Sequence, residues 1–335
     1  VAMQLSTGDA TTVAAALVQA DMRGIHSHGV TLATHYLERL AAGSIRPAAK
    51  MVVEQLGTCV ARLEGDCGMG QVVMNAAADA ALRMAQQHGA GLVAVRNSNH
   101  CGALPYYGLK IAASGCVGVV LTHTDPIMLP FGAKDAFLGT NPLCITMPGA
   151  DGHTFCLDMS TSIVAWNRVL DARRNKQELG EGWAVDAKGL DTRDAASARA
   201  LHPAGAHKGS GLAVMIDLVC AVLSGMLFGA DLPHMFAVTE TRRLGGFVGA
   251  LRFDSFGPPA VLEDRVREYA RRLHSLTPRA PDDTVKFPGE IEAICHQRSA
   301  SEGVRLPPAT LTALSHLARQ HHISWPFSPD GNPSQ

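Results

Sequence analysis

Two apolar runs, residues 91–97 (GLVAVRN) and 115–124 (GCVGVVLTHT), stand on either side of a helix-like stretch at 103–114. Short runs rich in β-branched residues and bounded by glycine or polar residues predict buried strands. Another helix is predicted at 71–88, and it stops at a glycine, as helices commonly do. A chain that alternates helices and strands in this way is typical of the α/β class.

The remaining strands do not follow the pattern of repeated parallel crossovers. Residues 51–64 read as short strands, and residues 129–162 contain short strands separated by Gly, Asn-Pro and Pro-Gly turns. Turns this frequent favour antiparallel pairing. We therefore expect a mixed, largely antiparallel sheet that includes a further strand at 245–253.

Helices are expected at both ends of the chain. Two helices within 10–42 flank the sequence RGIHSHGV, and an amphipathic helix at 262–276 leads to a helical C-terminus whose last ten residues fray. The apolar stretch 211–230 is long enough to cross a bilayer, but Asp217 and two glycines interrupt it and no aromatic or basic anchors flank it. We expect a helix buried in a soluble core, and an exposed, charged excursion at 171–200.

Three segments are expected from this order of elements. Residues 1–55 form the helical N-terminal part of a substrate and dimer domain, and residues 56–255 form an α/β cofactor-binding domain. Residues 256–335 form a C-terminal helical part that packs with the N-terminal segment. A chain of 335 residues is long enough for two domains of this kind.

The composition argues against several function classes. The chain carries a net charge of -1 and no basic block, so nucleic acid and membrane surfaces are not expected partners. The eight cysteines include no CxxC pair and most lie in apolar surroundings, which predicts free thiols in a reducing, cytoplasmic compartment. No signal peptide opens the chain, and its start at Val1 suggests an N-terminus that is cut short.

A Rossmann site is not predicted. The sequence GAGLVA at 89–94 matches GxGxxA, but it follows a helix and precedes a strand. The fingerprint needs the reverse order, so that a pyrophosphate meets a helix N-terminus. A better anion site is PAGAHKGSGLAV at 203–214, where Lys208 and three glycines introduce the apolar helix. A glycine-rich turn capped by Ser210 is the alternative.

Three histidines are candidates for chemistry. His100 follows the strand at 91–97, at a strand end where α/β sites tend to form, and an imidazole suits proton transfer near neutral pH. His26 and His28 form an H-x-H sequence, so the three together raise a second hypothesis, a metal-dependent hydrolase. No HExxH or other recognised metal spacing accompanies them, and no metal site is predicted. A structural role is the alternative for each.

Two more strand ends carry polar residues, in THTDP at 122–126 and LDMSTS at 157–162. Hydroxyls and carboxylates at such ends suit ribose or substrate. Asx or Ser/Thr turns are the alternative, because these residues commonly bond their own backbone. Neither sequence is specific alone.

Taken together in chain order, these motifs resemble the family of type 2 malate/lactate dehydrogenases, which also contains sulfolactate, ureidoglycolate and diketogulonate enzymes. The resemblance spans residues 14 to about 303. It rests on the ordered set RGIHSHGV, NSNHCGALPYY, PFGAKDAFLGTNPL, FCLDMSTS, GWAVDAKG, AGAHKGSGLAVMIDL and FPGE. Within the family, AWNRVLDARR, TDP, FGADLPHMF and RRLGG resemble the ureidoglycolate branch most.

The resemblance implies a non-Rossmann nicotinamide-binding fold in a homodimer or larger assembly, with the cofactor near the subunit interface. It implies reversible hydride transfer between NAD, or NADP, and a small 2-hydroxy acid. Ureidoglycolate, oxidised to oxalurate, is the expected substrate; malate, lactate, sulfolactate or a diketogulonate-type acid is the alternative. The Arg242-Arg243 pair is a candidate for the 2′-phosphate of NADP, although surface arginines are usually just solvated.

The resemblance also implies roles for single residues. His100 matches the general acid/base, and Ser27 and His28 match the residues that line the nicotinamide and the substrate. Tyr36 and Asp125 match substrate contacts. The implied cofactor contacts are Thr124, Asp158, Met159, Ser160, Lys208, Gly289, Glu290 and Ile291.

One position departs from the family. Its members usually read SHGxxRxxxY, whereas this chain reads SHGVTLATHY, so Tyr36 is present but Leu32 replaces the arginine expected to grip the substrate carboxylate. Loss of a bidentate, charge-assisted contact typically costs about 1.5–3 kcal/mol. Either another cation compensates, or the substrate or activity differs. A member that binds nucleotide without turnover is therefore a third hypothesis.

Overall fold

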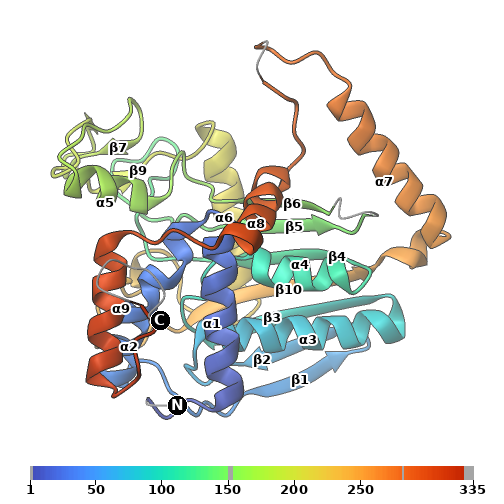
Figure 1. The fold of residues 1–335 in the computed structure, drawn as a ribbon, viewed down its shortest axis with the longest axis horizontal. Helices are drawn as coiled ribbons and strands as arrows, with labels where there is room; N and C mark the ends of the chain where they lie inside the picture. The colour runs from blue at the N-terminus through green and yellow to red at the C-terminus, as the bar shows by residue number, and fades with distance from the viewer. Residues whose placement is uncertain (1–2, 150–153, 281–282, 328–335) are drawn as a thin grey trace.

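The computed structural model describes residues 3–149, 154–280 and 283–327. Its centre is a seven-stranded sheet in the spatial order β1 (Val52–Gly57), β2 (Val60–Glu64), β3 (Ala90–Ser98), β10 (Leu244–Arg252), β4 (Cys116–Thr122), β5 (Leu143–Met147) and β6 (Phe155–Met159) (Figure 1). Strands β2 and β3 run parallel, and the other five neighbouring pairs run antiparallel. The predicted α/β class and the mixed, largely antiparallel sheet are confirmed.

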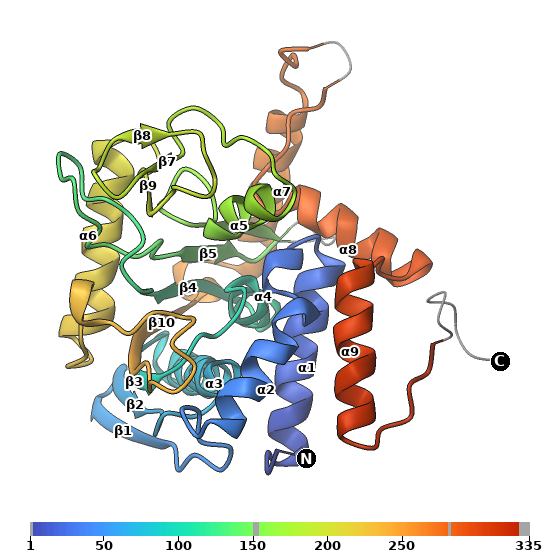
Figure 2. The ribbon, with the colours of Figure 1, turned by 90° about the vertical axis from the view of Figure 1, so that its left-hand side faces the viewer.

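Helices cover both faces of this sheet. Helices α3 (Gly70–His88) and α4 (Pro105–Ala113) lie on one face, and α6 (His207–Val222) lies on the other (Figure 2). Two successive glycines of β10 mark the faces, because neighbouring residues of a strand point to opposite sides. A Cβ on Gly245 would meet the carbonyl of Cys220 in α6, whereas a Cβ on Gly246 would meet Met74 in α3.

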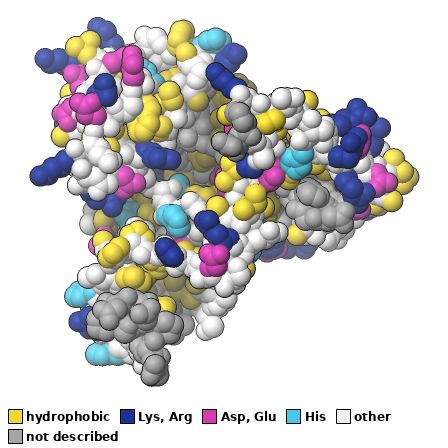
Figure 3. Space-filling model, turned by 45° about the horizontal axis from the view of Figure 1, so that its top comes forward, with side chains coloured by type: hydrophobic (Ala, Val, Ile, Leu, Met, Phe, Trp, Pro, Cys, Tyr) yellow, Lys and Arg dark blue, Asp and Glu magenta, His cyan; other side chains and the backbone are white. Residues whose placement is uncertain are grey.

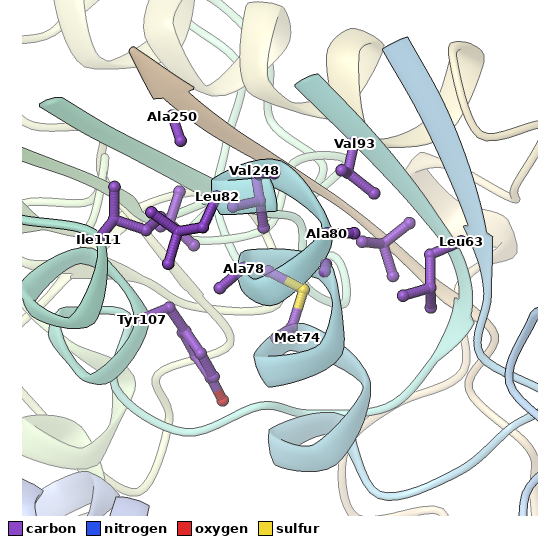
Figure 4. Close-up of a cluster of buried hydrophobic side chains, with 14 of the residues drawn as sticks. Leu63, Met74, Ala78, Ala80, Leu82, Val93, Tyr107, Ile111, Val248 and Ala250 are labelled. Atoms are coloured by element: carbon purple, nitrogen blue, oxygen red, sulfur yellow. The ribbon is translucent and has the colours of Figure 1, made fainter. Parts of the chain in front are cut away.

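The main core lies between α3 and the sheet. Side chains of α3, among them Met74 and Leu82, lie over Val93 and Val248 of the strands (Figure 4). Alanines fill much of the rest of this helix face, so the helix approaches the sheet closely. Helix α3 ends at Gly89, whose φ of 86° is left-handed, and β3 follows at once. The GxGxxA match is therefore a helix end, as predicted.

The terminal helices gather at one end of the sheet. Helix α1 (Thr7–Met22) packs against α8 (Glu290–Glu302), and α2 (Ala33–Ala41) packs against α9 (Pro308–Gln320) (Figure 2). Two short 3-10 turns, His26–His28 and Val30–Leu32, connect α1 to α2, so the two predicted helices around RGIHSHGV are confirmed. The expected division at 55 and 255 stays a prediction, and the C-terminal residues predicted to fray fall largely outside the described residues.

Helix α7 (Pro259–His274) projects from the body, with Ala270 as its buried residue (Figure 1). Lys and Arg side chains gather on this arm (Figure 3). Two of them, Arg271 and Arg272, pair with Glu268 one turn away. Two further 3-10 turns are present: Gly229–Asp231 lies between α6 and β10, and Phe253–Phe256 follows β10 directly. None of the described helices is both long and apolar enough to cross a membrane.

The excursion expected at 171–200 is instead a small folded lobe. It contains α5 (Trp166–Arg174) and a three-stranded sheet in the order β8 (Asp191–Thr192), β7 (Ala184–Val185) and β9 (Ala200–Leu201). The lobe has its own core, because the alanines and leucines between its charged residues point inward. The expectation was wrong because strands of two residues are too short to show a period.

The expectation for the apolar helix was also wrong. Helix α6 begins four residues earlier than predicted and ends at Val222, and it is not buried all round. One side of it exposes Leu212, Met215, Leu218 and Val222. A uniformly apolar sequence does not reveal which side of a helix a sheet covers, and here the sheet covers only one.

The contact of α3 with β3 gives a stability prediction. A Cβ on Gly91 would lie 2.0 Å from the backbone oxygen of Ala81, whereas a Cβ on Gly249 would lie 3.4 Å from its nearest neighbour. Since overpacking of a tight core typically costs about 1–3 kcal/mol, we expect Gly91→Ala to lower the free energy of unfolding by about that amount. Urea denaturation measures it. Gly249→Ala is the matched control, and an equal effect in both variants would contradict the explanation.

Candidate active site

A cavity of about 710 Å³, here called the central cavity, opens where β3 and β4 end. The turn at 26–28 and helix α5 of the small lobe form its other walls, and the side-chain amide of Asn167 ties them together by donating to the carbonyl of Ser27 (3.0 Å). Eight of the predicted site residues line it: Ser27, His28, His100, Thr124, Asp125, Asp158, Met159 and Ser160.

The loop that carries His100 is held by the side-chain amide of Asn99 and by a close contact between its backbone and α3. The side-chain amide of Asn99 donates to the carbonyls of Cys67 (3.0 Å) and Gly68 (2.9 Å). At Gly70 a Cβ would lie 2.3 Å from the carbonyl oxygens of Asn99 and His100. The start of α3 therefore lies directly against this loop, and only glycine allows the approach.

The turn that carries His28 is organised by a buried carboxylate. Asp21, near the end of α1, accepts the backbone N–H of Val30 (2.7 Å) and bonds the ring of His26 (2.9 Å). A Cβ on Gly29 would overlap this carboxylate at 2.1 Å. The glycine of the SHG sequence thus leaves room for Asp21, and the turn directs His28 into the central cavity.

Two imidazoles stack at the centre of the site. The rings of His28 and His100 lie 5.6 Å apart, with 22° between their planes. The Tyr36 hydroxyl bonds Nδ1 of His100 (2.6 Å), and the Ser27 hydroxyl bonds Nδ1 of His28 (2.8 Å). Tyr36 itself is buried behind His100 and does not line the cavity.

Burial makes both imidazoles weak bases. It lowers the pKa of His28 to about 4. Burial, followed by the neighbouring His28 and the guanidinium of Arg242, holds the pKa of His100 well below its usual value. Burial also keeps Tyr36 protonated by raising the pKa of its hydroxyl. Both rings are therefore neutral near pH 7.

Asp125 lies in the same wall, held from three directions. It forms an ion pair with Arg242 and accepts from the ring of His234 (3.2 Å) and the backbone N–H of Met235 (3.1 Å). Burial alone would raise the pKa of this carboxyl, but Arg242 and the Met235 N–H outweigh burial and lower it. Asp125 is therefore a fixed negative charge in the cavity wall.

A second buried pair was not predicted. His123 Nδ1 lies 2.8 Å from Asp217 of α6, and its Nε2 accepts the backbone N–H of Gly245 (2.8 Å). Because Nε2 is an acceptor, Nδ1 carries the proton and the ring is neutral. The pair joins α6 to the end of β4 and the start of β10, and His123 itself lines the central cavity. A charged residue inside an apolar helix was the available signal, since such a group requires a polar partner.

An adjoining cavity of about 1030 Å³ meets the central one at Ile25, Ala165 and the segment 158–160. The predicted Gly289 and Ile291 line it, together with apolar side chains and three cations, Arg23, Arg168 and Lys286. The two spaces together suit an elongated ligand with aromatic and anionic parts.

Two polar groups of the adjoining cavity suit a dinucleotide, and one of them, Asp158, also lines the central cavity. Nε of Arg23 is buried without a hydrogen-bond partner among the described residues, so this wall offers a donor to an anion. The side chain of Asp158 is exposed to the cavity space, yet burial within the surrounding protein raises its pKa to about 7. The residues present therefore fit a dinucleotide, with a cation for its phosphates and a carboxyl for its sugar hydroxyls.

The structure does not bring all predicted residues to these cavities. Lys208 is exposed on the first turn of α6 and lines neither, and Ser210 accepts from the Phe131 N–H (2.9 Å) instead of capping the turn. The carboxylate of Glu290 accepts the Phe287 N–H (3.0 Å) and pairs with His274 at the end of α7, so it is committed to contacts within the protein.

The three histidines of the metal hypothesis are not brought together. His26 is half exposed, pairs with Asp21 and faces a separate cavity beside α8, while His28 and His100 face the central one. Across residues 3–149, 154–280 and 283–327, no group of three or more His, Cys, Asp and Glu side chains has a geometry that could hold a metal ion.

Position 32 faces the central cavity and offers only a leucine side chain. The Arg242-Arg243 pair, in contrast, is divided. Arg243 is exposed, but Arg242 is buried and lines the central cavity beside Asp125. The alternative of a solvated arginine pair is therefore wrong for Arg242, because this side chain, two residues before β10, points inward to Asp125.

Comparisons with known proteins agree with these observations. A family model described as malate/L-lactate dehydrogenase matches residues 1–315. The ureidoglycolate dehydrogenase (NAD(+)) of Escherichia coli (strain K12) is 34% identical over 298 residues, which cover 89% of this chain and 85% of that protein. The malate dehydrogenase of Pyrococcus abyssi is 32% identical over 323 residues, covering 93% and 88%. The solved structure of sulfolactate dehydrogenase from Methanocaldococcus jannaschii matches with a TM-score of 0.89 at 30% identity, covering 96% and 93%.

The low pKa of His28 predicts acid sensitivity. In the unfolded chain a histidine binds its proton near pH 6.5, whereas folded His28 does so only near pH 4. The unfolded state therefore binds more protons between these values, and the free energy of unfolding falls as the pH falls through that window. Between about pH 7 and pH 4.5 the free energy of unfolding should fall by about 1–3 kcal/mol less in His28→Asn than in the wild type. Urea denaturation at the two pH values measures this difference. His316→Asn, at an exposed histidine of α9, should keep the full fall; an equal effect of the two variants would contradict the assignment.

Proposed function

The chain belongs to the malate/L-lactate dehydrogenase family, and from this premise we propose that it oxidises ureidoglycolate to oxalurate with NAD. The coarser activity follows from the family: an oxidoreductase that acts on the CH–OH group of a small 2-hydroxy acid and uses a nicotinamide cofactor. The observation that supports the site most is the bond between the Tyr36 hydroxyl and Nδ1 of His100, which leaves the other nitrogen of the ring for the substrate.

His100 is the proton-transfer group in this proposal. When the alcohol is oxidised, the proton of its hydroxyl goes to Nε2 of His100, and it returns from there when the keto acid is reduced. A tyrosine hydroxyl can donate or accept, so Tyr36 supports whichever tautomer of the ring the direction requires. The low pKa of His100 keeps the ring neutral, with one of its two nitrogens free of a proton.

His28 and Ser27 orient the substrate oxygen. The Ser27 hydroxyl fixes the ring of His28 through Nδ1, which leaves Nε2 to contact the reacting oxygen. A donor held in place stabilises charge that develops on this oxygen. Because the rings of His28 and His100 stack at 5.6 Å, both can reach one oxygen atom.

A nicotinamide bound here would supply the hydride acceptor, or in reverse the donor, for the carbinol carbon. The residues proposed to hold the dinucleotide are those of the junction and the adjoining cavity: Thr124, Asp158, Met159, Ser160, Gly289 and Ile291. Arg23 contributes its unpaired donor to the phosphates. Lys208 and Glu290, placed away from this space, stay predictions from the resemblance alone.

Ureidoglycolate is proposed from two supports. The E. coli enzyme that is 34% identical bears the name ureidoglycolate dehydrogenase (NAD(+)), and Asp125 places a fixed carboxylate in the wall, which suits the N–H groups of a ureido substituent. Malate, lactate, sulfolactate and diketogulonate-type acids are the alternatives. NAD is proposed before NADP on the first support.

A homodimer is proposed as the working assembly. The exposed apolar side of α6 and the projecting α7 would both gain burial against a second copy. The eight cysteines are free thiols, which supports a reducing compartment such as the cytoplasm.

Removal of the proposed acid/base should abolish most turnover. We expect His100→Asn to lower kcat by about 10²–10⁴-fold, the usual contribution of general acid–base catalysis, while the Kd for NADH stays near that of the wild type. His26→Asn is the matched control, since this histidine is half exposed outside the central cavity. Turnover by His100→Asn close to that of the wild type would refute the role, and an equal loss in His26→Asn would show that the effect is not specific to His100.

A substrate screen tests the finer assignment. NAD and NADP are offered with ureidoglycolate, malate, lactate and sulfolactate, and NADH formation is followed by absorbance. We expect kcat/KM to be highest for ureidoglycolate with NAD. A higher value for another acid would change the substrate and leave the role of His100 intact. Binding of NADH without turnover on any acid would support a member that has lost its activity.

A further inference from the structure

Arg242 is held in the wall of the central cavity with most of its donors unused. The side chain is 1% exposed, and one nitrogen of its guanidinium pairs with Asp125. The other two nitrogens, Nε and Nη1, are buried and have no hydrogen-bond partner among the described residues. Together they carry three N–H donors. Buried donors almost always have a partner, so this arrangement points to an acceptor that enters the cavity.

Other arginines near the site are committed to the protein. Arg39 donates to the carbonyls of Met235, Ala237 and Glu240, so it fixes the segment before β10, and it does not line the cavity. Arg173 and Arg199 stand exposed where the small lobe meets the cavity, and both donate to carbonyls of that lobe. Among the described arginines that line the central cavity, Arg242 is the buried one.

The charges around Arg242 favour an additional anion. Arg39 lies close enough that, after burial, the charge of Arg242 is the main cause that lowers the pKa of Arg39 to about 10. The carboxylate of Asp125 pairs with Arg242, and its negative charge also raises the pKa of Arg39. The other carboxylate that raises the pKa of Arg39 belongs to Glu240, which is exposed. Two buried cations that share one buried carboxylate would gain from a second one.

The position of Arg242 relative to the reacting groups is also suitable. Leu32, where the family places its arginine, lines the same cavity and offers no cation. Arg242 is near enough to His100 to contribute to the low pKa of that ring. An acid bound to the guanidinium would therefore lie in the space that His28 and His100 face.

We propose that Arg242, held by Asp125, binds the carboxylate of the substrate and so takes over the task of the arginine that Leu32 replaces. This inference rests on the proposed action on a 2-hydroxy acid. It makes Arg242 a substrate-binding residue and assigns the carboxylate to the side of the cavity where β10 begins. A planar guanidinium suits this task, since its forked donors match the two oxygens of a carboxylate.

The test measures binding of a carboxylate separately from turnover. Oxamate, an analogue of a 2-keto acid, and its neutral amide oxamide are titrated into the enzyme–NADH complex, with NADH fluorescence as the readout. We expect the wild type to prefer oxamate by about tenfold or more, and Arg242→Lys, which keeps the charge but loses the fork, to weaken oxamate by about tenfold. The Kd for NADH should stay within about threefold, and KM for the acid should rise more than kcat falls.

The adjacent exposed arginine provides the matched control. Arg243→Lys should bind oxamate like the wild type. If Arg242→Lys fails to fold, the double variant Arg242→Gln with Asp125→Asn removes both charges of the pair, and the same loss of preference for oxamate is expected. Oxamate binding within about threefold of the wild type in a folded variant that binds NADH would overturn the proposal.

The outcome also separates this inference from the proposed function. A wild-type complex that binds oxamate through Arg242 but turns over no 2-hydroxy acid would refute the activity and keep the carboxylate site. A wild-type complex that turns over an acid but shows no preference for oxamate over oxamide would overturn the role of Arg242 and keep the activity.

Discussion

The site depends on one close backbone contact, between the start of α3 and the loop after β3. A Cβ on Gly70 would lie 2.3 Å from the carbonyl oxygens of Asn99 and His100, so only glycine allows the helix to begin here. The side-chain amide of Asn99 also donates to the carbonyls of Cys67 and Gly68, in the loop that precedes α3. Any side chain at position 70 would push the loop outward and move His100 away from Tyr36. The main core lies directly behind this contact, so the packing of α3 on the sheet fixes the loop and the loop fixes the imidazole.

Around that fixed point, burial and charge give the neighbouring groups different protonation states. His28 and His100 are neutral because burial lowers their pKa values, whereas Asp125 stays ionised because Arg242 outweighs its burial. Asp158, farther along the cavity, has its pKa raised to about 7. Groups whose environments shift their pKa values in opposite directions are typical of catalytic sites, because acid and base tasks must be divided among them.

Much of this arrangement could be predicted from the sequence, and the failures have physical causes. His100 was predicted at a strand end, and the pattern that predicted it was local: an apolar run, a polar break and a glycine. The exposed side of α6 was missed because an apolar helix gives no sign of which side a sheet covers. The small lobe was missed because two-residue strands show no period. Arg242 was considered only as a phosphate contact, because the sequence does not show that one arginine of the pair is buried against Asp125.

The orientation of Arg242, beside the sheet, depends on different contacts from those that would orient a cation at position 32. A side chain on the 3-10 turn would rely on the packing of the terminal helices for its orientation. The guanidinium of Arg242 is instead oriented by Asp125, whose own position is fixed by the Met235 N–H. The segment that supplies this N–H is held by Arg39 from α2. If Arg242 binds the substrate carboxylate as proposed, its orientation is coupled, through Asp125 and Arg39, to the contact between α2 and the segment before β10.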